Sequence, residues 1–104
     1  MEKSLFSPED VKKLPNKPGI YKFYSAESKI LYVGKAKDLR KRVASYFRGN
    51  VFKGKKTQRL INETKQIEIT IVNSEFDAIL LENTLIKEHQ PKYNILLKDD
   101  KTFP

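Results

Sequence analysis

Hydrophobic and polar positions along the chain predict three β-strands. Residues 67–72 (IEITIV) alternate strictly between apolar and polar side chains, which is typical of a strand with one buried face. Residues 19–24 (GIYKFY) and 30–33 (ILYV) are rich in aromatic and β-branched residues, and they predict two further strands. Because only a short polar segment separates these two, we expect an antiparallel hairpin.

Capping signals and helical spacing predict helices in the first half of the chain. Ser7 followed by Pro8 indicates a short helix that ends near Leu14. Asp38 is the expected N-cap of a helix over residues 39–47, in which apolar side chains recur at helical spacing.

Two more helices are expected in the second half. Residues 57–65 predict a short helix. Ser74 with Asp77 forms a loose variant of the capping box and opens a long helix that reaches His89. Pro91 ends this helix because proline disfavours helical conformation in the residue before it.

The predicted fold is one α+β domain over residues 1–104. Its expected order is helix, two strands, helix, helix, strand, helix, which makes a small three-stranded, mainly antiparallel sheet flanked by helices. Residues 93–97 (YNILL) are expected to add one more short extended piece.

Composition narrows the class of protein. The 104 residues are 38% hydrophobic, enough for one modest core. The chain has no cysteine, which excludes a disulfide framework and a cysteine-based zinc site. It contains no apolar run of membrane-spanning length and no signal-peptide pattern, so we expect a soluble intracellular protein without a membrane partner.

The positive charge is concentrated in one segment. The net charge is +8, and residues 35–59 contain ten basic side chains but one acid. Such a patch suits a polyanion because each neutralised phosphate releases counterions, although a solvated lysine-rich surface would have the same composition. The candidate nucleic-acid-binding residues are Lys35, Lys37, Arg40, Lys41, Arg42, Arg48, Lys53, Lys55 and Lys56.

Glu82 is a carboxylate within an apolar stripe of the last long helix. A buried carboxylate is costly unless it is paired or binds a cation. Three interpretations stay open: a buried salt bridge, with Arg42 as one partner, a cation ligand, or a side chain that points into a cleft. The apolar residues that share its face are Ala78, Ile79, Leu85 and Ile86.

Four other residues have both a structural and a functional interpretation. Arg42 either covers the edge of an apolar face or holds phosphate oxygens with its planar guanidinium. Tyr21 and Tyr32 either pack in the core or line a site, and Lys35 is either a surface lysine or a phosphate ligand.

Two tripeptides lead to a family resemblance. Gly19-Ile20-Tyr21 and the later Tyr-Val-Gly at residues 32–34 resemble the signature of the GIY-YIG endonucleases. The longer runs LPNKPGIY, YVGKAKDLRKRVASYF and LLENTLIKEHQPKYNILLKDDKTFP are similar to the N-terminal domain of the UvrC branch, the excinuclease subunits of bacterial nucleotide excision repair. The likeness covers residues 14–104.

The resemblance implies an activity and a site. It implies a cytoplasmic bacterial DNA endonuclease that makes the 3′ incision in excision repair, with Glu82 as the metal ligand. It also implies that this chain is an N-terminal part of a longer protein, which acts on double-stranded DNA and binds UvrB through regions outside this chain. The implied catalytic residues are Tyr21, Tyr32, Lys35, Arg42, Tyr46, Glu82 and Asn94.

The residue types suggest a mechanism. Glu82 is the only carboxylate in this set, so we expect one mostly hydrated Mg²⁺ or Mn²⁺ ion. No histidine is placed as a base, so a tyrosine is the predicted base. We favour Tyr21 with Tyr32 as its orienting partner, although the sequence does not decide between the two, and Arg42 is expected to stabilise phosphoryl charge. The competing hypotheses are a non-catalytic nucleic-acid-binding module and a domain that docks on an acidic protein.

Overall fold

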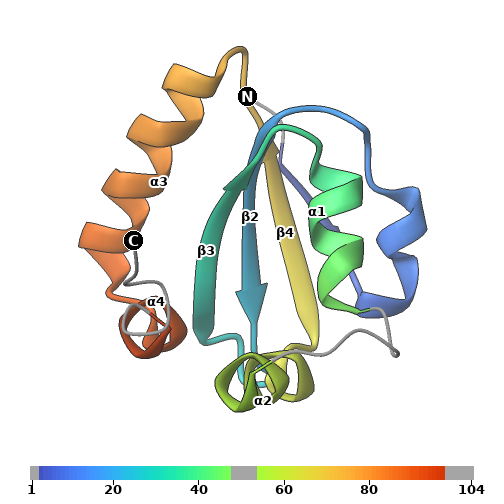
Figure 1. Cartoon of the computed structure of the whole chain (residues 1–104), viewed down its shortest axis with the longest axis vertical. Helices are drawn as coiled ribbons and strands as arrows, with labels where there is room; N and C mark the ends of the chain where they lie inside the picture. Colours follow the sequence, from blue (N-terminus) through green and yellow to red (C-terminus); the bar gives the residue numbers. More distant parts are fainter. Residues whose placement is uncertain (1–2, 48–53, 98–104) are drawn as a thin grey trace.

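A four-stranded antiparallel sheet forms the centre of the molecule (Figure 1). The structure is a computed structural model that describes residues 3–47 and 54–97. The strand order is β1-β4-β2-β3. The strands are β1 (Lys3–Phe6), β2 (Gly19–Tyr24), β3 (Ile30–Ala36) and β4 (Gln66–Ile71).

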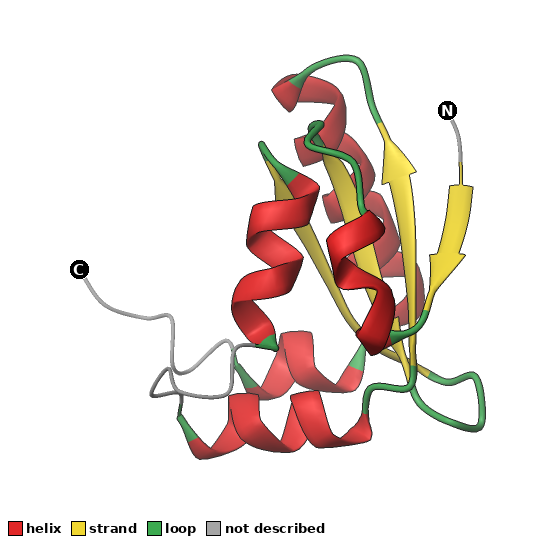
Figure 2. Ribbon diagram, turned by 90° about the vertical axis from the view of Figure 1, so that its right-hand side faces the viewer, coloured by secondary structure: helices red, strands yellow, loops and turns green. Residues whose placement is uncertain are grey.

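Helices cover both faces and one end of this sheet. η1 and α1 lie on one face, α3 lies on the other, and α2 and α4 lie at the end where the β2–β3 hairpin turns (Figures 1 and 2). The helices are the 3₁₀ helix η1 (Pro8–Lys13), α1 (Leu39–Tyr46), α2 (Lys55–Glu63), α3 (Glu75–His89) and α4 (Lys92–Leu96).

Alternation along the strands separates two apolar clusters. On β2, Tyr21 and Phe23 face η1 and α1, whereas Ile20 faces α3. The larger cluster continues through Leu39 and Val43 of α1. The smaller cluster contains Ile20, Val33, Val72 and Ala78, with Leu81, Leu85 and Ile86 packed against it.

The predicted three-stranded sheet is wrong because it lacks β1. This strand pairs with β4 from Lys3↔Thr70 to Phe6↔Ile67. It is only four residues long and its partner is more than sixty residues away, so neither length nor local composition indicated it.

The predicted extended piece at residues 93–97 is also wrong. Residues 92–96 form helix α4, with Pro91 at its N-cap. A short apolar run is compatible with either a strand or a buried helix. Here the segment is helical, and Tyr93 packs in the core.

The other predicted elements are confirmed, with shifted ends. The β2–β3 hairpin is antiparallel, and β3 continues to Ala36. Asp38 caps α1 by accepting the Lys41 N–H at 3.0 Å, and Ser74 caps α3 by accepting the Asp77 N–H at 3.2 Å. None of the described helices is long and apolar enough to cross a membrane.

Candidate active site

Three tyrosines from three elements meet on the sheet face that α1 covers. Tyr21 comes from β2, Tyr32 from β3 and Tyr46 from α1. Their ring centroids lie 5.8, 6.2 and 6.4 Å apart. The hydroxyl oxygens of Tyr21 and Tyr46 are 2.9 Å apart and share a hydrogen bond. Tyr21 is only 1% exposed, so its phenol belongs to the core as well as to this cluster.

The two motif glycines make room for this arrangement. Gly34 lies opposite Tyr21 in the hairpin, and a Cβ at residue 34 would lie 2.4 Å from the Tyr21 Oη. A Cβ at Gly19 would lie 2.3 Å from the carbonyl oxygen of Thr70. These contacts explain in steric terms why the motif needs glycine at both positions.

Burial raises the pKa of all three phenols and so makes the phenolate form harder to reach. It raises the pKa of Tyr21 well above the ordinary value, and the neighbouring Tyr46 and Tyr32 add to the shift while Arg42 opposes it. Burial also raises the pKa of Tyr32 and of Tyr46. A phenolate in this cluster therefore requires an additional positive charge close by.

Arg42 joins the tyrosine cluster to the solvent. Its Nε donates to the Tyr21 hydroxyl at 3.3 Å, and its Nη2 donates to the Tyr46 hydroxyl at 3.4 Å. Interaction with Tyr21 raises the pKa of Arg42, so the guanidinium stays charged. This fixed cation beside polarisable phenols is suited to hold an anion.

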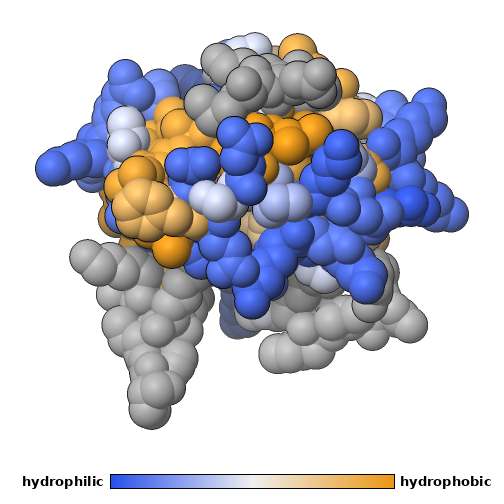
Figure 3. Space-filling model, turned by 90° about the horizontal axis from the view of Figure 1, so that it is seen from above, coloured by the Kyte–Doolittle hydropathy of each residue, from blue (hydrophilic) through white to orange (hydrophobic). Residues whose placement is uncertain are grey.

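A pocket of about 250 Å³ opens beside Arg42. It lies between the end of β3, the start of α1 and the first turns of α3, at the end of the molecule seen in Figure 3. That view shows apolar surface among hydrophilic side chains. The pocket is lined by Lys35, Ala36, Lys37, Arg42, Glu75 and Ile79.

Glu82 lies half-buried on the side of α3 that carries the pocket wall. Ile79, one helical turn earlier, lines the pocket. Burial raises the pKa of Tyr32, the hydrogen bond to Tyr46 and the charge of Arg42 lower it, and the charge of Glu82 raises it. The carboxylate of Glu82 therefore lies near the phenol of Tyr32. Arg42 directs its guanidinium to the hydroxyls of Tyr21 and Tyr46.

Asn94 holds the edge of β3. Its Oδ1 accepts the N–H of Val33 at 2.8 Å, and its Nδ2 donates to the carbonyl of Val33 at 2.9 Å. The amide thus pairs with the strand as another strand would. Val33 lies between Tyr32 and Gly34, so Asn94 positions the motif.

The structure divides the predicted basic patch. Lys35, Lys37 and Arg42 line the pocket, whereas Lys55 and Lys56 lie on α2 at the other end of the sheet (Figure 1). Lys56 also donates to the Leu96 carbonyl at 3.1 Å, which ties α2 to α4.

The remaining members of the predicted patch are exposed or outside the described part of the chain. Arg40 and Lys41 are exposed on α1, and Arg40 donates to the Asn16 side chain at 3.4 Å. Arg48 and Lys53 lie outside the described residues.

Sequence reasoning missed part of the pocket wall. Glu75 lies 3.5 Å from Lys37 across the pocket mouth, and Ile79 is 42% exposed although it is apolar. The available signal was spacing, because Glu75, Ile79 and Glu82 recur at i, i+4 and i+7 on one helix face.

The donor set fits one hydrated hard cation. Within the described residues, no group of three or more histidine, cysteine, aspartate or glutamate side chains gathers to form a protein cage for a metal ion. Mg²⁺ usually keeps several water ligands and binds one or two carboxylates. The half-buried carboxylate of Glu82, beside neutral phenols, matches this coordination preference.

Fold and site together define a class of protein. The paired strands that carry GIY and YVG, with an arginine on α1 and an acid on α3, define a GIY-YIG domain. The family model described as the UvrC-like GIY-YIG domain matches residues 17–95, and the chain belongs to this family.

Curated relatives extend far beyond the length of this chain. The UvrABC system protein C of Cytophaga hutchinsonii is 55% identical over 94 residues, which are 90% of this chain and 16% of that protein. The protein of the same name from Nautilia profundicola is 50% identical over 101 residues, with 92% and 16% covered. The chain therefore spans about a sixth of these relatives.

Solved structures match the fold. The GIY-YIG N-terminal endonuclease domain of UvrC from Thermotoga maritima, bound to its catalytic magnesium ion, has a TM-score of 0.72 and 34% identity, over 82% of this chain and 91% of that one. A variant of that domain with one tyrosine replaced by phenylalanine also matches with a TM-score of 0.72 and 33% identity, and it too holds the catalytic divalent cation.

Proposed function

We propose that this chain is a metal-dependent DNA endonuclease domain that hydrolyses a phosphodiester bond. The observation that carries the proposal is the contact of Arg42 with the hydroxyls of Tyr21 and Tyr46 at the wall of a pocket, with Glu82 on the adjacent helix. The related domain from Thermotoga maritima is named an endonuclease and holds magnesium, which supports the same cofactor here.

Each side chain has a role that its position allows. Glu82 would hold the Mg²⁺ or Mn²⁺ ion, which supplies Lewis-acid stabilisation at the scissile phosphate. Arg42 faces the pocket and stabilises negative charge on the phosphoryl oxygens, and Lys35 holds a neighbouring phosphate oxygen. Asn94 acts through the backbone of β3 and positions Tyr32.

The proton acceptor comes from the tyrosine cluster. The Tyr21 hydroxyl shares a hydrogen bond with the Tyr46 hydroxyl and accepts one from Arg42. If Tyr21 loses its proton, both neighbours can therefore donate hydrogen bonds to the phenolate oxygen. Because burial raises the pKa of Tyr21, this phenol becomes a base only when a cation is bound nearby. Tyr32 orients the attacking water from the adjacent strand.

The relatives support a proposal for the larger reaction. They are components of the UvrABC system, so we propose that this domain makes the 3′ incision in bacterial nucleotide excision repair, in the cytoplasm and on double-stranded DNA. Contact with UvrB is assigned to regions outside residues 1–104.

Substitution of Glu82→Gln tests the proposal. Because glutamine keeps the size but loses the charge, the variant should lose Mn²⁺ binding in calorimetry and lose nicking of supercoiled plasmid. Glu88→Gln, an exposed carboxylate on the same helix, is the matched control and should retain both. A non-catalytic DNA-binding module would instead show unchanged Mn²⁺ binding in Glu82→Gln, and that result would overturn the nuclease assignment.

A further inference from the structure

The pocket beside Arg42 has two chemically different walls. Lys35 of β3, Lys37 of the connection between β3 and α1, and Arg42 of α1 supply cations, whereas Ile79 of α3 and Ala36 supply apolar surface. A site for phosphate alone does not need an apolar wall. A site for an apolar ligand does not need three cations.

The charges leave capacity for one phosphate group. Lys37 lies 3.5 Å from the Glu75 carboxylate, which neutralises part of its charge. Lys35 and Arg42 both line the pocket, and the hydroxyls of Tyr21 and Tyr46 to which Arg42 donates carry no charge. Two cations on one wall are therefore available to phosphate oxygens.

The size and position of the pocket fit one nucleotide. Its volume of about 250 Å³ is just below the ~300–1,000 Å³ of sites that enclose drug-sized ligands, so it has room for one nucleotide that keeps part of its surface in solvent. Ile79 precedes Glu82 by one helical turn, so the apolar wall lies next to the carboxylate that would hold the metal. The pocket thus adjoins the position of the scissile phosphate.

We propose that this pocket receives one unstacked nucleotide of the strand that is cut, next to the scissile phosphate. This inference rests on the proposed function. The base packs on Ile79, the sugar packs on Ala36, and the 5′-phosphate binds Lys35 and Arg42. Unstacking a nucleotide costs least where DNA is already distorted, so the pocket favours cutting of distorted DNA.

Methyl NMR of the chain tests the pocket directly. Thymidine 5′-monophosphate should shift the methyl resonances of Ile79 and Ala36 in a saturable manner. Inorganic phosphate and 2-deoxyribose 5-phosphate, which lack the base, should leave the Ile79 methyl in place and bind at least fivefold more weakly. Equal affinity for the nucleotide and for deoxyribose phosphate would show that the pocket takes phosphate only, and would overturn the proposal.

A matched pair of variants gives a second readout. Ile79→Trp fills the pocket and should reduce affinity for thymidine 5′-monophosphate to that of deoxyribose phosphate. Leu80→Trp adds the same ring at the next residue, which is 51% exposed and outside this pocket, and should leave that affinity unchanged. Equal affinity in both variants would contradict the proposal.

Mn²⁺ calorimetry on the same samples separates this inference from the nuclease assignment. Intact Mn²⁺ binding without a base-dependent shift at Ile79 overturns the nucleotide pocket alone. A base-dependent shift without Mn²⁺ binding overturns the nuclease assignment and leaves a nucleotide-binding pocket.

Discussion

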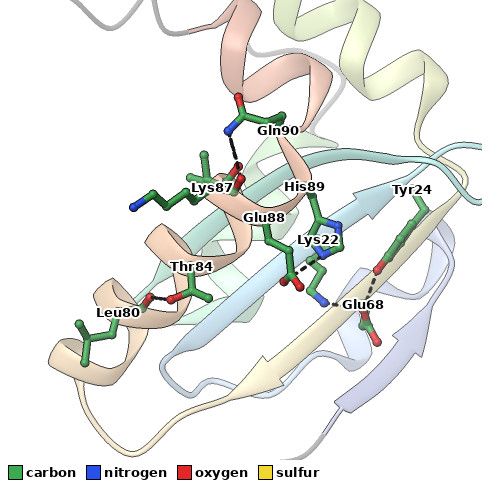
Figure 4. A network of polar contacts seen from close by, with 10 residues as sticks. Lys22, Tyr24, Glu68, Leu80, Thr84, Lys87, Glu88, His89 and Gln90 are labelled. Atoms are coloured by element: carbon green, nitrogen blue, oxygen red, sulfur yellow. Dashed lines mark hydrogen bonds and ion pairs between the residues drawn. The ribbon is translucent and has the colours of Figure 1, made fainter.

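Two polar clusters lie on opposite faces of the same sheet, and they differ in charge balance. On the face toward α3, Lys22 lies 3.2 Å from Glu68, and the Tyr24 hydroxyl donates to the same carboxylate at 2.9 Å (Figure 4). On the other face, Arg42 donates to the hydroxyls of Tyr21 and Tyr46, which carry no charge.

The difference shows how each cluster is used. In the Lys22 cluster one cation meets one anion, and both side chains are largely buried, so the group is complete as it stands. In the Arg42 cluster the cation has hydrogen-bond partners but no countercharge among them, and it lines a pocket. We therefore expect the first cluster to serve the fold, and under the proposed function the second receives an anionic ligand.

The largest expected effect is the loss of nicking activity when Arg42, in the second cluster, is replaced. Arg42→Met should lower nicking by about 10²–10³-fold, as loss of a transition-state donor does. Stability should change by less than ~1 kcal/mol, because the Tyr21 and Tyr46 hydroxyls remain bonded to each other. Plasmid nicking and urea unfolding of the same samples measure both quantities. A loss of stability as large as the loss of activity would show that Arg42 is structural.

Gly34→Ala should disturb the tyrosine cluster through shape alone. The new Cβ would lie 2.4 Å from the Tyr21 hydroxyl, so the ring must move, at a cost of about 1–3 kcal/mol in unfolding free energy. Gly54→Ala is the control, because a Cβ there meets nothing within 4 Å, and it should cost less than ~1 kcal/mol. Equal losses in urea unfolding would contradict the steric explanation.

Lys22→Met should affect stability and leave the site intact. Removing the Lys22 cation leaves the Glu68 carboxylate without this countercharge, and we expect the free energy of unfolding to fall by about 1–3 kcal/mol. The loss is smaller than for a fully buried pair because Glu68 is in part accessible to water. Mn²⁺ affinity should stay unchanged. The double variant Lys22→Met, Glu68→Leu should recover part of the stability, and failure to recover would show that the pair is not the cause.

The smallest effect concerns pH. Burial and the hydrogen bond to Glu68 raise the pKa of Tyr24 to about 12. Because the folded-state pKa lies above the ordinary value of about 10, the contribution of this phenol is complete below pH 10 and is lost as the pH rises to 12. Tyr24→Phe should remove that part of the pH dependence of unfolding. An unchanged profile would assign the dependence to other tyrosines.

Local pattern was sufficient for most of the fold and for the core of the candidate site. The β2–β3 hairpin and the capped helices α1 and α3 depend on contacts between near neighbours. The family motif pointed to Tyr21 and Tyr32, and the structure brings both together with Tyr46. β1 and α4 were not predicted because contacts with distant residues determine them. β1 forms by pairing with β4, and α4 forms because Tyr93 is buried in the core.

The sequence by itself determined the alternation of strands and helices, the place of the basic segment and the family motif, because these depend on residue order and side-chain period. Only the tertiary structure decided that Arg42 binds phenols and that the amide of Asn94 pairs with Val33. It also divided the basic residues between a pocket and the far end of the sheet. The physical reason is that strand register and helix packing set the distances between residues that are far apart in the chain.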